Sequence, residues 1–191
     1  ERVRVDGRPI REGAVSAFTA QIEDYVTDRA ASGDAPTFFE TLTAMALWEF
    51  DRQDVDVAVL EVGIGGKHDA TSVVDPVASA VTSVTLEHTE FLGDTIEEIA
   101  RDKAHVAPDD GGLVTTADGD ALEAIESVAG AVTTVGGEDA DVTVEYLGKR
   151  DHTEAGVRIR TDGAEIETAI PTLGAHQARN AGVAAGLVRA T

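Results

Sequence analysis

Apolar residues occur along this chain both in short unbroken runs and in longer mixed segments. Residues 55–62 (VDVAVLEV) form one apolar run rich in branched residues, and residues 78–86 form another. Such runs are typical of parallel strands buried on both faces of a sheet. Residues 12–31 contain both apolar and polar residues, over a length typical of a helix. This alternation predicts an α/β fold, with a mostly parallel sheet and helices on both of its faces.

Two of the expected helices carry a recognisable start signal. Thr37 and Thr95 are each followed three residues later by a glutamate. This is the capping-box spacing, in which the hydroxyl and the carboxylate each accept a hydrogen bond from the other residue's backbone N–H group. The sequence predicts helices from these points to about Gln53 and about Val106, the second ending before Pro108.

Shorter segments continue the alternation towards both ends of the chain. Residues 1–10 predict a short strand with a turn at Asp6-Gly7. Residues 136–172 contain only strand-like pieces joined by polar turns, which predicts a small β-rich appendage. The remaining expected elements are strands at 112–116, 131–135, 142–147, 156–160 and 164–170, and helices at 118–129 and 174–190.

Composition narrows the classes of function. The 191 residues fit one domain, and 36 acidic against 15 basic residues give a net charge of −21. That charge repels phosphate backbones, which argues against nucleic-acid binding, and it suggests adaptation to a high-salt cytosol.

The absence of cysteine excludes disulfides and thiolate metal sites. No apolar run or leader suggests a membrane or secreted protein, so a cytoplasmic location is expected. The first and last residues suggest a piece of a longer protein.

Two ionisable residues are expected at one edge of the sheet. Glu61 ends the first apolar run, and His88 follows the second. Because the carboxyl ends of parallel strands meet at one edge, a carboxylate and an imidazole are expected to converge there. Such a pair suits Mg²⁺, which takes few protein ligands and keeps several waters. The alternative is that both are solvated loop residues.

Lys103 and the glycine-rich loop give weaker signals. Lys103 is one of three lysines in the chain, and its spacing alone favours an ion pair with an acid of the same helix, such as Glu98 or Asp102. The loop at residues 63–66 matches neither a dinucleotide fingerprint nor a P-loop. It is also explained by a tight turn that needs positive φ angles.

Several segments together resemble one family, the folylpolyglutamate synthase and dihydrofolate synthase branch of the Mur ligase superfamily. The matching segments are ERVRVDGRPI, APTFFETLTAMAL, VDVAVLEVGIGGKHDAT, TLEHTEFLGDTIEEIARDKA and TLGAHQARNA. Their order and separations also match. The resemblance implies that residues 1–191 are part of the central ATPase-type domain, with the P-loop upstream and a glutamate-binding domain downstream.

The activity implied by the resemblance is ATP-dependent amide formation. ATP phosphorylates the carboxylate of dihydropteroate or a folate, and the amino group of L-glutamate attacks the acyl phosphate. Mg²⁺ and cations then neutralise charge on the transferred phosphoryl group. The resemblance implies that Glu61, His88 and Lys103 are metal ligands, with Lys103 carbamylated, and that His88 and Lys103 serve catalysis. A fragment of the enzyme is expected to be inactive alone.

The resemblance also implies a set of substrate contacts. Thr37 and Phe39 at the start of one helix, with Asp69 and Ala70 after the glycines, would contact the pterin, and Asn180 would lie near the adenine of ATP. By spacing alone, Phe39 is a core residue and Asn180 a polar helix residue. The parent chain could be fused to another folate-pathway domain. Two alternatives remain: a Mur-type peptide ligase acting on another carboxylate, and a non-catalytic domain that retains the fold.

Overall fold

The computed structural model describes residues 2–191, and the chain divides into two compact units, Glu1–Gly63 and Ile64–Thr191, which are described separately. The first unit opens with the predicted short strand and turn, which form part of a hairpin between β1 (Arg4–Val5) and β2 (Arg8–Pro9). Its two turn residues, Asp6 and Gly7, have φ angles of 50° and 72°. Two successive positive φ angles match the right-handed twist of a tight hairpin.

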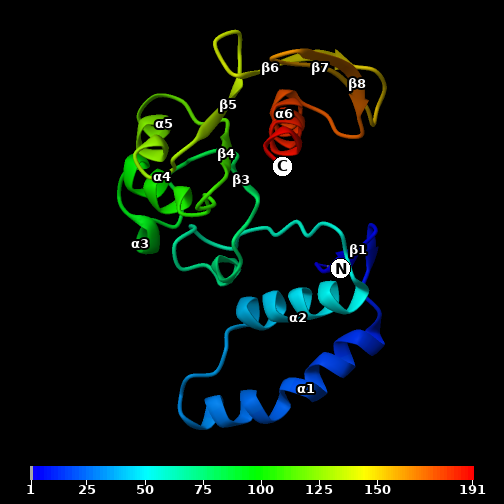
Figure 1. The fold of residues 1–191 in the computed structure, drawn as a ribbon, viewed down its shortest axis with the longest axis vertical. Coiled ribbons are helices and arrows are strands. Elements are labelled where there is room, and N and C mark those ends of the chain that lie inside the picture. The colour runs from blue at the N-terminus through cyan, green and yellow to red at the C-terminus, as the bar shows by residue number, and fades with distance from the viewer. Residues whose placement is uncertain (1) are drawn as a thin grey trace. The chain divides into compact units, whose positions relative to one another are not determined.

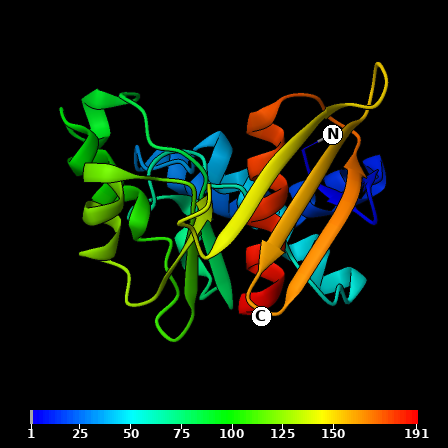
Figure 2. The same ribbon diagram turned by 90° about the horizontal axis from the view of Figure 1, so that it is seen from above.

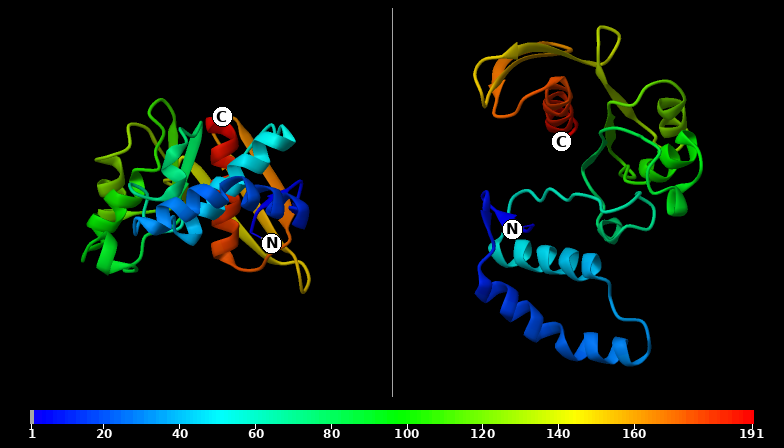
Figure 3. Two further views of the ribbon diagram at one scale, coloured as in Figure 1. Left: turned by 90° about the horizontal axis from the view of Figure 1, so that it is seen from below. Right: turned by 180° about the vertical axis from the view of Figure 1, so that it is seen from behind.

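Two helices complete the regular structure of the first unit. Helix α1 (Glu12–Ala31) and helix α2 (Phe38–Gln53) follow the predicted bounds and lie side by side, as the right-hand view of Figure 3 shows. The ring of Phe18 on α1 is buried, and its centroid lies 5.6 Å from that of Trp48 on α2. An aromatic pair at this distance adds to the apolar burial that joins the helices.

The predicted buried strand at residues 55–62 is wrong. This segment is extended but unpaired, and its valines Val57 and Val59 are 79% and 88% exposed. A strand needs a neighbour for its backbone N–H and C=O groups. Within residues 2–63 of the first unit, β1 and β2 pair with each other and not with this segment. Its apolar composition alone therefore does not make it a strand.

The second unit is built on one six-stranded sheet with the order β3-β4-β5-β6-β7-β8. Strands β3 to β6 run parallel to one another, β7 is antiparallel to β6, and β8 is antiparallel to β7. The predicted β-rich subregion thus continues the main sheet, because β6 pairs in parallel with β5. The strands are β3 (Ala78–Val81), β4 (Gly112–Thr115), β5 (Val132–Gly136), β6 (Val142–Lys149), β7 (Ala155–Thr161) and β8 (Ala164–Ile170).

Helices cover both faces of this sheet, as the sequence predicts. On one face α4 (Ile96–Ala104) and α5 (Gly119–Glu126) pack on β3 and β4, around the buried Leu113 and Ile125. On the other face α6 (Ala175–Ala190) packs on Val114 and Val135. Figures 1 and 2 show α6 on the concave side of β6, β7 and β8. No helix within residues 2–191 has the length and apolar character needed to cross a membrane.

Two glycines allow α6 to approach the sheet closely. A Cβ atom on Gly182 would lie 2.3 Å from Cγ2 of Val144, and one on Gly186 would lie 2.9 Å from Cγ1 of Val114. Real side chains do not approach so closely, so a larger residue would push the helix away from the strands. The small residues of this helix therefore set its distance from the sheet.

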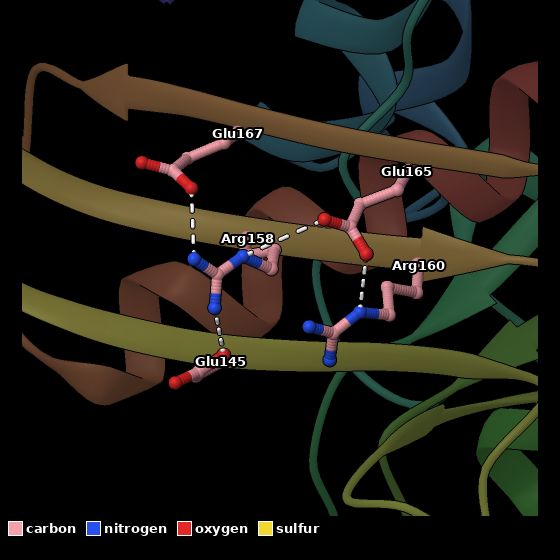
Figure 4. A network of polar contacts seen from close by, with 5 residues as sticks. All are labelled: Glu145, Arg158, Arg160, Glu165 and Glu167. Atoms are coloured by element: carbon pink, nitrogen blue, oxygen red, sulfur yellow. Dashed lines mark hydrogen bonds and ion pairs between the residues drawn. The ribbon is translucent and has the colours of Figure 1, made fainter.

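The outer face of β6, β7 and β8 carries a charge network, shown in Figure 4. Arg158 donates to Glu145 (2.6 Å) and to Glu167 (2.8 Å) and forms an ion pair with Glu165 (3.7 Å). Arg160 donates to Glu165 at 2.5 Å, and this hydrogen bond is the main reason why the pKa of Glu165 is lowered. The register places Glu145 and Glu167 opposite Arg158, and Glu165 opposite Arg160, so that each acid faces a base on the adjacent strand β7.

Candidate functional site

Three predicted site residues lie in the first unit. Thr37 is the N-cap of α2: its hydroxyl accepts a hydrogen bond from the Glu40 N–H at 3.2 Å, and the Glu40 carboxylate accepts one from the Thr37 N–H at 2.7 Å. The backbone hydrogen bond from Thr37 is the largest cause of the lowered pKa of Glu40. Phe39 is half-buried, whereas its neighbour Phe38 is 72% exposed. Glu61 lies exposed in the unpaired segment, not at the end of a strand.

His88 holds a strained backbone position directly before the short helix α3 (Thr89–Leu92). Its φ and ψ angles of 52° and 35° are left-handed, a conformation that costs a residue with a Cβ atom about 1–2 kcal/mol. Its carbonyl oxygen accepts hydrogen bonds from the N–H groups of Phe91 and Leu92, which start the helix. Strain of this kind concentrates at functional sites, and the imidazole here is exposed.

Lys103 lies near the C-terminal end of α4, and its side chain is 20% exposed. Its Nζ donates a hydrogen bond to Oε1 of Glu87 at 3.0 Å. The expected ion pair with Glu98 or Asp102 is therefore wrong, because Glu87 lies sixteen residues away, outside the helix. The hydrogen bond from Lys103 and then its charge lower the pKa of Glu87. Since His88 follows Glu87, the contact brings two predicted site residues to one edge of the sheet.

The side chains at this edge have ligand atoms that suit a hard cation. Glu87 supplies carboxylate oxygens and His88 an imidazole beside the amine of Lys103, and Mg²⁺ is held by one or two carboxylates with several waters. Within the described residues, no group of three His, Cys, Asp or Glu side chains is placed to hold a metal ion.

Asp69 and Ala70 close the glycine loop, defined here as residues 64–69. Asp69 is only 8% exposed and caps the 3₁₀ helix η1 (Ala70–Val73). Its Oδ1 accepts hydrogen bonds from the N–H (2.9 Å) and the hydroxyl (2.6 Å) of Thr71, and its Oδ2 accepts one from the Ile64 N–H at 3.1 Å. The carboxylate thus holds the two ends of the loop together. Ala70 begins η1.

Two residues that connect these parts were not among the predicted site residues. Asp102 accepts a hydrogen bond from the N–H of Gly66 in the glycine loop, at 2.9 Å. Glu87 accepts from Lys103, as described above. Both contacts join segments distant in sequence. Both acids lie in the segment 85–104 that resembles the family, but their spacing did not single them out as site residues. The adjacent glycines Gly65 and Gly66 are the one sequence signal that indicates a close approach of two backbone segments.

Asn180 lies exposed on α6, where its side-chain amide donates to Oε1 of Gln177 at 3.4 Å. It is separate from two open grooves at the other end of the helix, of about 410 and 450 Å³. The first groove is apolar and lies between α6 and the strands β7 and β8, with Ile159, Ile166 and Val188 in its lining. Neither groove is lined by any predicted site residue.

Comparisons with known proteins agree with this fold. Residues 16–188 match the Mur ligase middle domain family. The chain is 63% identical over its whole length to a probable bifunctional folylpolyglutamate synthase/dihydropteroate synthase of Halobacterium salinarum, and covers 24% of that protein. It is 33% identical over 96% of its length to folylpolyglutamate synthase of Lacticaseibacillus casei, and covers 44% of that protein.

A solved structure gives the same result for the fold. A protein described as an FPGS–AMPPCP–folate complex superposes with a TM-score of 0.87 at 30% identity, over 99% of this chain and 47% of the other. The chain thus spans less than half the length of the relatives it matches. The acidic surface agrees with the similarity to a Halobacterium protein. The family resemblance predicted from the sequence is confirmed: the chain belongs to the Mur ligase middle domain family.

Proposed function

We propose that this chain is the middle-domain part of an ATP-dependent ligase that adds L-glutamate to dihydropteroate or a folate. The family match supports the ligase class. The similar proteins of Halobacterium salinarum and Lacticaseibacillus casei are both named folylpolyglutamate synthases, and the similar solved structure is described with AMPPCP and folate. Together these likenesses support a folate as acceptor over another carboxylate.

The proposed reaction has two steps. A carboxylate oxygen of the acceptor attacks the γ-phosphorus of ATP, and ADP leaves. The amino nitrogen of glutamate then attacks the acyl phosphate, so that a C–N bond forms, phosphate leaves and the nitrogen loses a proton. Negative charge spreads over the phosphoryl group in the first step, so that fixed cations near it lower the barrier.

The observation that carries this proposal is the 3.0 Å contact between Lys103 and Glu87. It supports a common site for Lys103 and His88, which adjoins Glu87. In the proposal, carbamylation of Lys103 replaces this ion pair, and His88, the carbamate of Lys103 and Glu61 hold Mg²⁺. When bound, Mg²⁺ supplies positive charge that neutralises the phosphate oxygens. The left-handed backbone of His88 supports this role, since strained backbone positions of this kind concentrate at functional sites.

The proposed contacts with the pterin and with ATP follow from the positions of these residues in the segments that resemble the family. Thr37 and Phe39 would bind the pterin at the start of α2, and Asp69 and Ala70 would bind it at the end of the glycine loop. The Asp69 carboxylate already accepts one hydrogen bond from Ile64 in the glycine loop and two from Thr71 in η1, so its role there is mainly to shape the loop. Asn180 would contact the adenine of ATP through its exposed amide on α6.

We also propose that the parent polypeptide joins this ligase to a second folate-pathway domain. Two similar halobacterial proteins are named as bifunctional enzymes with dihydropteroate synthase, and the chain covers 24% and 23% of them. A cytoplasmic location fits a reaction that consumes ATP and glutamate. Assaying the polypeptide that carries these residues for both activities, and fractionating the cells that make it, tests this part of the proposal.

The decisive experiment replaces Lys103 in the ligase polypeptide that carries these residues. Lys103→Ala is expected to lower kcat for addition of radiolabelled glutamate to dihydropteroate by a factor of about 100 or more. Lys149→Ala, which removes an exposed lysine from β6, is the matched control and should leave kcat unchanged. Equal activity of the two variants would contradict the proposed role of Lys103. Failure of dihydropteroate and folates to raise the Tm of the wild type would point to another carboxylate substrate.

A further inference from the structure

The glycine loop is fastened to helix α4 at one point in its middle. The Gly66 N–H donates a hydrogen bond to Oδ1 of Asp102 at 2.9 Å, across 36 residues of sequence. The ends of the loop are closed separately by Asp69. An N–H group bound to a carboxylate makes a stronger and shorter hydrogen bond than one bound to a neutral acceptor. Asp102 therefore determines where the middle of the loop lies on the helix.

Both glycines of the loop are required by this approach. A Cβ atom on Gly65 would lie 2.2 Å from Oδ1 of Asp102, and one on Gly66 would lie 2.7 and 2.9 Å from the carbonyl oxygens of Asp102 and Lys103. Gly65 also has a φ angle of +71°. The loop backbone thus rests directly on the peptide groups of α4 that carry Lys103, with no side chain between them.

A continuous series of contacts then leads from the loop to the proposed site. Gly66 binds Asp102, the next residue is Lys103, and Lys103 binds Glu87 beside His88. Asp102 and Lys103 are consecutive on one helix, so their side chains leave it in directions about 100° apart. One side chain fixes the loop while the other reaches the site edge. All of these residues belong to the second unit.

We propose that Asp102 is a positioning residue of the ligase: it locks the glycine loop onto α4 and thereby fixes the backbone that presents Lys103. This inference rests on the proposed function, because it assigns Asp102 a role in that reaction. Asp102 does not touch substrate or metal in this proposal. Loss of the lock lets the loop leave α4 and leaves Lys103 without a fixed orientation, which lowers the rate of phosphoryl transfer more than it weakens substrate binding.

The test compares three variants in the ligase polypeptide that carries these residues. Asp102→Ala removes the acceptor. Asp102→Asn keeps a side-chain oxygen that can accept the same hydrogen bond, and Asp109→Ala removes an exposed acid just beyond α4. Asp102→Ala is expected to lower kcat at least tenfold while KM for ATP stays within twofold. Asp102→Asn should recover kcat to within threefold of wild type, and Asp109→Ala should match wild type.

A second measurement does not depend on activity. Hydrogen exchange of the Gly66 amide, followed by NMR, should be at least tenfold faster in Asp102→Ala than in wild type and little changed in the other two variants. If Asp102→Ala does not fold, Asp102→Leu replaces it, since leucine branches at Cγ as aspartate does but has no acceptor.

The possible results separate the two proposals. Unchanged exchange of the Gly66 amide in the variant without an acceptor overturns the lock. Faster exchange with wild-type kcat, or an Asp102→Asn variant as inactive as Asp102→Ala, overturns the positioning role. A wild-type polypeptide that shows the protected amide but adds no glutamate overturns the proposed function, and the positioning role with it, while the lock itself stands.

Discussion

The segment 55–62 and the strand β4 are built from similar branched apolar residues, yet their environments are opposite. In β4, Leu113 and Val114 are fully buried, because β3 and β5 pair with the strand on its two sides and helices cover its two faces. In the segment 55–62, Val57 and Val59 are largely exposed. Apolar composition shows what a segment gains by burial, but its partners decide whether burial happens.

The largest expected difference between these regions is the cost of truncating a valine or leucine. Leu113→Ala should lower the free energy of unfolding by about 2–5 kcal/mol, because it leaves a cavity between the sheet and its helices. Val59→Ala should change it by no more than about 0.5 kcal/mol, as expected for an exposed position. Urea unfolding followed by circular dichroism measures both. A cost for Val59→Ala close to that of Leu113→Ala would mean that the segment 55–62 is buried in solution.

This contrast also explains which parts of the fold the sequence predicted. Local signals succeeded: both capping boxes are present, and α1 and β8 have the expected bounds. The family resemblance was likewise readable, because it depends on quoted motifs. Long-range features were not. The pairing of β6 with β5 and the exposure of residues 55–62 depend on which segments meet in space.

The same division applies to the candidate site. Glu61, His88 and Lys103 could be selected because an acid, an imidazole and a rare lysine stand next to strand-like or helical signals. Glu87 and Asp102 could not, because this chain has 36 acidic residues and nothing local distinguishes these two. Their roles come from hydrogen bonds that span 16 and 36 residues.

A second prediction applies one substitution to helices in the two units. Gly182→Ala should destabilise the protein by about 1–3 kcal/mol, because the new methyl group would overlap Val144 and Val135. Gly13→Ala in α1 has open space around the added atom and should stabilise by about 0.5–1 kcal/mol through helix propensity. Thermal unfolding of both variants gives the two signs. Equal signs would show that packing does not distinguish these helices.

A third prediction concerns the local signal that both units share. Thr95→Ala and Thr37→Ala should each cost about 1 kcal/mol, because each removes the hydroxyl that accepts a hydrogen bond at a helix start. Serine at either position keeps the hydroxyl and serves as the control. Urea titration, followed by Trp48 fluorescence for α2 and by circular dichroism for α4, measures the costs. If only the Thr95 cap contributed, capping would depend on the surrounding sheet and not on local geometry.

The smallest effect is expected on the outer face of β7 and β8, where charged groups are exposed and ion pairs contribute little. The hydrogen bond from Arg160, followed by the charges of Arg160 and Arg158, lowers the pKa of Glu165 below its ordinary 4.5. A carboxyl group with a lowered pKa stabilises the fold above its unfolded pKa, and this stabilisation is lost as the pH falls through the folded value.

Arg160→Met should therefore reduce stability at pH 7 slightly and make the loss on acidification shallower, whereas Arg150→Met should not. NMR titration of Glu165, with urea midpoints at pH 7 and in acid, measures both effects. Added salt should shrink the difference at pH 7, because it screens exposed charges. A salt-independent difference would mean that Arg160 acts by packing its carbon chain against the strands.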